Sequence, residues 1–234
     1  IRDSEISGFE NSVDSQAQDI QISNSHLTGL DNNTGTGLCC NDSSVHSLKM
    51  KNSIISRFQT ALSADRKENE ITSCTFTDNA YTLCESCYFS YSLLFRNCII
   101  WDGDLGSYAH SFEFCDIYNG VPESAVHAVG NISNSPAFVS SVNNDYHLLP
   151  ASACIDAGHP LSDYSEEPLP NGNRINIGAY GNTPDAANTM VIIGDDDSVS
   201  DSWQYYYWDT AYQNDPANEI YGPDGDFDGD GFSN

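Results

Sequence analysis

The sequence predicts an all-β solenoid, in which the chain winds into short coils that stack on one another. Three observations predict this fold class. A six-residue pattern recurs through the first half of the chain, the segments between Gly, Asn and Ser are short and rich in β-branched or aromatic residues, and no window keeps apolar residues at helical spacing. Hydrophobic residues make up 39% of the 234 residues, which is enough apolar side chain for a core.

The recurring pattern is an apolar residue, any residue, Asn or Asp, Ser or Cys, any residue and a second apolar residue. It occurs in degenerate form at 1–6, 22–27, 50–55, 71–76, 95–100 and 112–117. These starts lie 17 to 28 residues apart, which is close to one turn of a β-solenoid with loops of variable length. We therefore expect about six coils.

The pattern also predicts the shape of each coil. Side chains alternate along a strand, so the first, fourth and sixth residues cannot all share one face of a straight strand. We expect a bend at the Asn or Asp, because these residues tolerate the left-handed conformation of a corner. Stacking in register then aligns the fourth residues in one ladder: Ser4, Ser25, Ser53, Cys74, Cys98 and Cys115.

Eight cysteines are many for a reduced cytosolic protein of this size. We interpret Cys74, Cys98 and Cys115 as small buried ladder residues rather than catalytic thiols. Cys84 and Cys87 form one C-x-x-C, and no second pair stands at zinc-ribbon distance. Buried thiols, or one or two disulfide bridges, are therefore favoured over a zinc or redox role.

The charge balance excludes several classes of partner. The chain carries 34 Asp and Glu against 8 Lys and Arg, which gives a formal net charge of −26. Nucleic acid and anionic membrane surfaces need clustered basic residues, so neither is expected as a partner. No apolar run approaches the length of a membrane span, so we expect no membrane insertion.

The second half of the chain contains a series of short apolar and polar runs at 97–101, 131–139, 144–150, 152–158 and 176–180. In their order and approximate spacing, these runs resemble the closing segment of secreted bacterial right-handed parallel β-helix proteins. The resemblance implies a right-handed parallel β-helix whose coils occupy 1–125, followed by a C-terminal cap at 126–185, and an extracellular or cell-surface location. A cap has a physical reason, because the last coil of a solenoid leaves unpaired backbone groups and an apolar end.

The tail, 186–234, closes on a run that resembles the D-x-D-x-D-G calcium loops of thrombospondin type 3 repeats and dockerins. Three carboxylates at alternate positions can converge on one hard cation, and Gly231 at the sixth position permits the sharp turn. We predict Ca²⁺ ligands at Asp226, Asp228, Asp230, Phe232 (through its carbonyl) and Asn234. The twelfth position of such a loop falls after Asn234, so we expect a partner or further sequence to complete the site.

A second acidic cluster in the tail matches the loop only in part. Ile193 stands where a leading Asp is expected, and Ser198 stands where Gly is expected. A weaker calcium site is predicted here, at Asp195, Asp197 and Asp201.

Parallel β-helices include polysaccharide lyases, so an enzyme is one function to weigh. A uronate lyase needs a base, often Lys or Arg, near carboxylates, and the candidates are Lys49, Lys51 and Arg57. Carbohydrate binding is a further possibility, because Trp101, Trp203 and the aromatic run 205–208 can stack on sugars. No other catalytic motif stands out.

The sequence favours a non-catalytic structural or adhesive module over an enzyme. We expect an extracellular or cell-surface stalk or filament subunit, stabilised by calcium, whose partners are other copies of itself or neighbouring domains of a longer chain. The uronate lyase and the carbohydrate-binding module, with a polysaccharide as partner, remain the alternatives.

Overall fold

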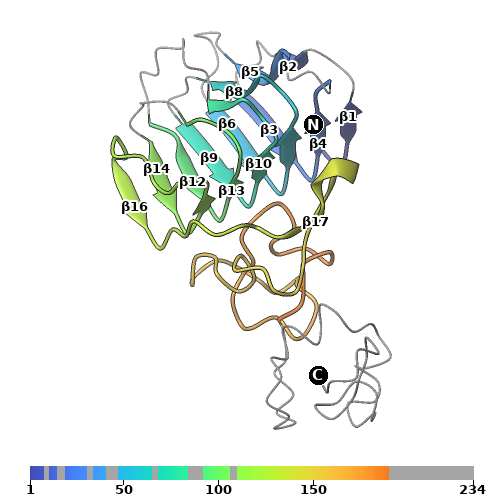
Figure 1. The fold of residues 1–234 in the computed structure, drawn as a ribbon, viewed down its shortest axis with the longest axis vertical. Coiled ribbons are helices and arrows are strands. Elements are labelled where there is room, and N and C mark those ends of the chain that lie inside the picture. Colours follow the sequence, from blue (N-terminus) through green and yellow to red (C-terminus); the bar gives the residue numbers. More distant parts are fainter. Residues whose placement is uncertain are drawn as a thin grey trace, which may run out of the picture.

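The computed structural model describes residues 1–7, 11–14, 19–30, 34–40, 47–64, 68–83, 92–105 and 110–189. Within these residues the fold is all-β, and three sheets of parallel strands run side by side along a solenoid-like stack (Figure 1). Each of the first four coils contributes one short strand to each sheet, whereas the last two coils contribute described strands to two of the sheets. The all-β, parallel and solenoid-like parts of the prediction are therefore confirmed.

Sheets I and II carry most of the stack. Sheet I is ordered β3 (Asp19–Ser23), β6 (Ser47–Lys51), β9 (Glu68–Thr72), β12 (Leu94–Arg96), β14 (Ser111–Glu113) and β16 (His127–Val129). Sheet II is ordered β1 (Glu5–Ser7), β4 (His26–Thr28), β7 (Ile54–Ser56), β10 (Thr75–Thr77), β13 (Ile99–Ile100) and β15 (Asp116–Ile117). Every strand pair in both sheets is parallel.

The remaining elements form a smaller parallel sheet and an antiparallel pair. Sheet III contains β2 (Asn11–Asp14), β5 (Thr36–Cys40), β8 (Thr60–Ala64) and β11 (Tyr81–Leu83), again with parallel pairing. An antiparallel pair, β17 (Phe138–Ser140) and β18 (Asp145–Leu148), encloses the 3-10 helix η1 (Ser141–Asn143). β16 extends sheet I, so the range assigned to the cap from sequence begins with a further coil strand.

The bend between sheets I and II follows the recurring sequence pattern. Its third residue has a positive φ in all six repeats, between 47° and 54°: Asp3, Asn24, Asn52, Ser73, Asn97 and Phe114. The predicted left-handed corner is confirmed, and Asn or Asp occupies four of the six positions because these residues adopt that conformation at low cost.

The fourth residue of each repeat closes the bend from inside. Its hydroxyl or thiol donates to the carbonyl two residues earlier, at 2.8 Å from Ser53 to Lys51 and at 3.3 Å from Cys98 to Arg96. The same contact is made by Ser4, Ser25, Cys74 and Cys115. The predicted ladder is therefore confirmed, and Cys74, Cys98 and Cys115 are buried free thiols.

The core lies inside the coils and is built from the first and sixth residues of the pattern. Ile22, Met50, Ile71, Phe95 and Phe112 follow one another in register across sheet I, and all are at most 1% exposed. The rings of Phe95 and Phe112 are stacked with centroids 5.4 Å apart. A second row in sheet II faces the first: Leu27, Ile55, Phe76, Ile100 and Ile117.

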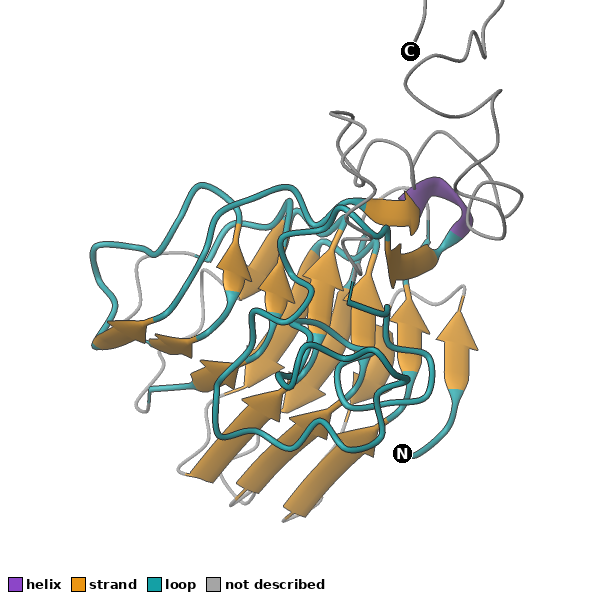
Figure 2. Ribbon diagram, turned by 90° about the horizontal axis from the view of Figure 1, so that it is seen from below, coloured by secondary structure: helices purple, strands orange, loops and turns teal. Residues whose placement is uncertain are grey.

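Residues 133–189 form a covering segment that lies along the outer face of sheet II. Figure 2, seen from the side of this segment, shows its loops crossing in front of the strands. Ile54 packs with Tyr146 and Ala179, and Ile99 packs with Cys154 and Ile177. β7 and β10 are consequently buried on both faces.

The contacts of the covering segment extend along the side of the stack from Asp116 in the last coil to His26 near the first. The resemblance implies a cap that follows the last coils. The wider coverage has a physical reason, because the outward-facing row of sheet II contains apolar residues that need shielding from water.

Candidate functional site

A groove of about 900 Å³ opens where the covering segment ends against the first coils. One wall consists of the bends between sheets I and II, from residues 2–5, 23–26, 51–52 and 54. The other consists of residues 166, 179–180 and 182–185. At the outward-facing position of sheet II, Ile54 is buried under the covering segment, whereas Glu5 in the first coil is exposed. The groove lies at this point because the covering segment does not extend over the strand of the first coil.

The groove wall carries charges of both signs. Arg2 and Lys51 are its cations, and its carboxylates are Asp3, Glu5, Glu166 and Asp185. Lys51 lies near the exposed edge of the covering segment: hydrogen bonds from Ser165 lower the pKa of Asp163, and the charge of Lys51 adds to that effect. The wall is therefore acidic, with Lys51 as a cation near carboxylates.

His26 lies at the inner edge of the groove. Its Nε2 is 3.3 Å from the Ser56 hydroxyl, and its ring meets the ring of Tyr146 edge to face at 5.5 Å. Burial lowers its pKa, against the opposing effect of the Glu5 charge. His26 is therefore neutral at pH 7, and it offers the groove a hydrogen-bonding ring rather than a charge.

Tyr180 forms part of the opposite wall. Its ring stacks on the ring of His147, with centroids 3.9 Å apart. Burial and the charges of Asp145 and Asp185 raise the pKa of Tyr180 to about 12. Its hydroxyl therefore remains protonated and can act as a hydrogen-bond donor at neutral pH.

The three lyase candidates from the sequence have different surroundings. Lys51 lines the groove. Lys49 does not line it, and on the outer face of sheet I its Nζ is 3.9 Å from a Glu70 oxygen. Arg57 donates to the carbonyls of Ser141 and Val142 at 3.4 and 2.9 Å and so holds η1 against the coils. Of the three candidates, Lys51 alone lines the groove.

The predicted calcium ligands of the tail, Asp226, Asp228, Asp230, Phe232 and Asn234, together with Asp195, Asp197 and Asp201, lie outside the described residues. Within the described part of the chain, no three side chains among His, Cys, Asp and Glu are grouped to hold a metal ion. In that same part, no helix has the length and apolar character needed to cross a membrane.

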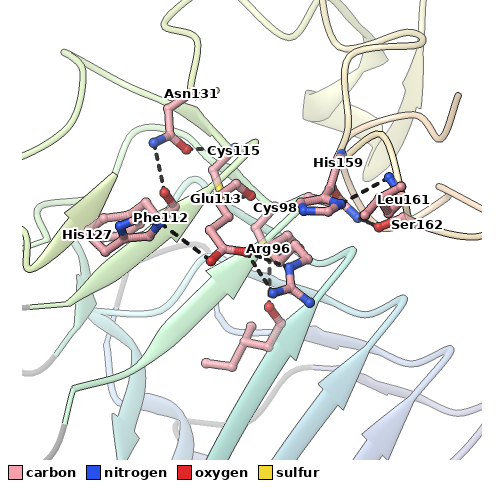
Figure 3. A network of polar contacts seen from close by, with 12 residues as sticks. Arg96, Cys98, Phe112, Glu113, Cys115, His127, Asn131, His159, Leu161 and Ser162 are labelled. Atoms are coloured by element: carbon pink, nitrogen blue, oxygen red, sulfur yellow. Dashed lines mark hydrogen bonds and ion pairs between the residues drawn. The ribbon is translucent and has the colours of Figure 1, made fainter. Parts of the chain in front are cut away.

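A polar network lies on the outer face of sheet I, at the other end of the stack. Arg96 donates through Nε and Nη2 to Glu113 Oε2, both at 2.7 Å, and His127 Nε2 is 3.7 Å from Glu113 Oε1 (Figure 3). The three side chains come from adjacent strands, β12, β14 and β16, so the network ties the last coils together.

In the same region, Asn131 follows Cys115, the last Ser or Cys residue of the ladder. Asn131 accepts the Cys115 amide through Oδ1 and donates to the Phe112 carbonyl through Nδ2, both at 2.9 Å (Figure 3). One amide side chain thus satisfies two backbone groups of the last bend.

A second, smaller groove of about 560 Å³ lies beside the bend after β13. Asp102, Asp104 and Glu123 line it, and the nearby Trp101 and Tyr118 rings meet edge to face at 5.1 Å. Burial, with the charge of Asp78, raises the pKa of Asp102. This groove is acidic and lacks a basic residue in its lining, so it is less suited than the first to an anionic polymer.

Comparison with protein-family models, curated proteins and solved structures returned no match. Any role of the larger groove must therefore be inferred from its own residues and geometry.

Sequence reasoning identified Lys51 but missed most of the groove. Glu166 and Asp185 come from loops more than a hundred residues away from Lys51 along the chain, and no spacing rule connects them. His26 had a signal: it follows the ladder residue Ser25, at the position that faces outward from sheet II.

Proposed function

We propose that this chain is a non-catalytic structural or adhesive β-solenoid module of an extracellular or cell-surface protein, of the right-handed parallel β-helix type, with a calcium-stabilised tail. It serves as a stalk, a surface module or a filament subunit. Its partners are copies of itself or neighbouring domains.

The observation that carries this proposal is the pair of open edges of the stack. Among the described strands, β1 pairs only with β4 and β16 pairs only with β14. Edge strands offer unpaired backbone groups to a further strand, and parallel coils present different surfaces at their two ends. A head-to-tail contact between such ends builds a filament rather than a closed dimer.

The distribution of the basic residues also supports a non-catalytic role. Lys49 pairs with Glu70, and Arg57 donates to the Val142 carbonyl. Lys51 is the third candidate base, and it lies near exposed carboxylates. A uronate lyase requires a base together with groups that stabilise the charge developing on the substrate carboxylate.

Electron microscopy of the protein purified from its source tests the structural role. We expect end-to-end assemblies, or a longer chain in which further coils continue the stack. Isolated monomers without neighbouring domains, at the concentration found in the source, would contradict the proposal.

A second candidate, a glycan-binding or uronate-lyase groove, is favoured by one observation: Lys51, Arg2 and the His26 ring line one groove with several carboxylates. Lys51→Ala and Lys49→Ala form a matched pair, since both lysines are exposed on the same strand and only Lys51 lines the groove.

Incubation with uronate polymers, followed by ultraviolet absorbance of unsaturated products, separates the two candidates. The structural proposal expects no product from the wild type or from either variant. Product that disappears in Lys51→Ala and persists in Lys49→Ala would establish the lyase. Binding without product that shows the same dependence would establish the glycan-binding module.

A further inference from the structure

Three side-chain oxygen atoms in the covering segment are buried and have no hydrogen-bond partner among the described residues: Asp156 Oδ1, Glu167 Oε2 and Thr189 Oγ1. Glu167 is only 4% exposed, although it is a carboxylate. Buried polar atoms normally have partners, because losing water without a replacement is costly. The three oxygens therefore indicate a bound water or ion beside the polypeptide.

A shared neighbour brings Asp156 and Glu167 into one part of the covering segment. The side-chain Oδ1 of Asn176 accepts the backbone amide of Asp156 at 2.8 Å, and the backbone amide of Asn176 donates to Glu167 Oε1 at 2.9 Å. The Asn182 amide donates to the same Oε1 at 2.8 Å, so Glu167 Oε1 is satisfied and Oε2 is the free atom.

The electrostatics agree with this proximity. Burial raises the pKa of both carboxyl groups, and the charge of Asp156 adds to the effect on Glu167. The Thr189 hydroxyl lies close enough to Asp156 to lower its pKa, although its Oγ1 makes no hydrogen bond of good geometry. The charge of Asp156 therefore reaches the Glu167 carboxyl group.

One positive charge lies nearby and does not neutralise both carboxylates. The Arg174 guanidinium lowers the pKa of Asp156, but it donates to the carbonyls of Ala157 and Gly158 rather than to a carboxylate. Two carboxylates and one guanidinium leave one net negative charge among these groups, and a cation would neutralise it.

The backbone around Asp156 is built to hold its side chain in place. Asp156 has a φ of +54°, and a Cβ at Gly172 would overlap the Asp156 carboxyl group. Gly172 itself has a φ of +56°, which further restricts this position to glycine. The loop therefore passes so close to the carboxylate that only a residue without a side chain fits there.

We propose that Asp156 and Glu167 bind a calcium ion in the covering segment, with the Thr189 hydroxyl as a third protein ligand. Calcium suits the site because it takes carboxylate, hydroxyl, carbonyl and water oxygens in flexible numbers. Only two of the protein ligands are carboxylates, so carbonyl oxygens or waters complete the coordination. The site is separate from the predicted tail loops and does not depend on the function proposed above.

A bound ion would join three parts of the covering segment, namely the turns at 156 and 167 and the end of the described chain at 189. This segment has little regular secondary structure, so each such link contributes directly to its order. Calcium would then stabilise the layer that shields the outer face of sheet II.

The test uses the full chain with Asp226→Asn, Asp228→Asn and Asp230→Asn, which removes the carboxylates of the stronger predicted tail loop. Thermal unfolding is followed with excess CaCl₂ and with chelator. A ligand that binds only the folded state raises the melting temperature, so we expect a rise with calcium and its loss in Asp156→Asn. Asn tolerates the left-handed backbone of Asp156, so this variant preserves the turn.

Glu167→Gln is the second variant, because its amide oxygen still accepts the Asn176 and Asn182 amides. Asp163→Asn is the matched control: Asp163 is an exposed acid of the same segment, and its change should leave the calcium response intact. Circular dichroism before calcium addition checks that each variant is folded.

Equilibrium calcium binding to the tail-substituted chain measures the site directly. We expect bound calcium in this chain and its loss in Asp156→Asn or Glu167→Gln. An absence of calcium binding would overturn the proposal. A response that survives both substitutions would show that calcium binds elsewhere in the chain, and it would also overturn the proposal.

Discussion

The coils and the covering segment satisfy their backbone groups in different ways. In the coils, strands pair in parallel with the strands of the neighbouring coils, and one ladder residue closes each bend. In the covering segment, strands are few, and single side chains hold several backbone groups at once. Glu167 accepts two amides, and Asn176 both accepts an amide through its side chain and donates to the Ala187 carbonyl.

This difference predicts different responses to substitution. A change in the coils removes one member of a row whose neighbours still pack, so its cost follows the buried apolar volume. A change in the covering segment removes a partner that no neighbouring coil can replace, so its cost follows the number of backbone groups left unpaired.

The largest effect is expected from the core of the coils. Phe95→Ala removes a fully buried ring that stacks on Phe112 and meets Phe76 edge to face. We expect the free energy of unfolding to fall by about 3–5 kcal/mol in urea denaturation. The matched control is Val142→Ala in the covering segment, where the side chain is 77% exposed and the expected change is within about 0.5 kcal/mol. Equal losses in the two variants would contradict this picture of the core.

The coils could be predicted from sequence because their physics repeats. Asn24 and Asn52 take the same left-handed corner, and Ser53 and Cys98 make the same contact two residues back. A six-residue pattern is therefore sufficient to place the bend, the ladder and the register.

The covering segment could not be placed in the same way, because its contacts join single residues far apart in the chain. Asn52 meets Ala179 and Gly181 across more than 120 residues, and no repeat marks that pairing. One signal was available: Ile54 and Ile55, like Ile99 and Ile100, are adjacent apolar residues on a short strand. Such pairs indicate a strand buried on both faces.

The groove was predictable only through Lys51 for the same reason. Its acidic wall is contributed by loops whose position follows from how the covering segment ends, and composition does not specify that position.

As the pH falls, the free energy of unfolding is expected to respond in opposite directions to a buried group in the coils and to one in the covering segment. Burial lowers the pKa of His110 in the coils to about 4, so the unfolded state binds this proton first as the pH falls. Stability from this group is complete above pH 6.5 and declines below it. We expect a loss of about 2–3 kcal/mol between pH 7 and pH 4.5.

His110→Asn should remove that loss, because an Asn oxygen can still accept the Leu93 amide that His110 Nδ1 now accepts at 3.1 Å. Urea denaturation of both proteins at the two pH values measures the difference. In the absence of calcium, the buried carboxyl of Glu167 acts in the opposite direction, since its raised pKa makes the folded state gain stability as the pH falls towards 4.5. An identical pH dependence of the wild type and His110→Asn would show that His110 is not the group responsible.

The smallest effect compares one position in two coils and so isolates the contribution of the covering segment. Asn24 and Asn52 both have a φ of +47°, so replacement by Ala imposes the same backbone cost in each. Asn24 is exposed and donates to Asp3, whereas buried Asn52 donates to the Ala179 and Gly181 carbonyls at 2.9 and 2.7 Å. We expect Asn52→Ala to cost about 2 kcal/mol more than Asn24→Ala, because two buried carbonyls lose their donor. Hydrogen exchange should locate that excess in residues 146–181 rather than in the coils, and an excess spread evenly over both would mean that the covering segment unfolds together with the stack.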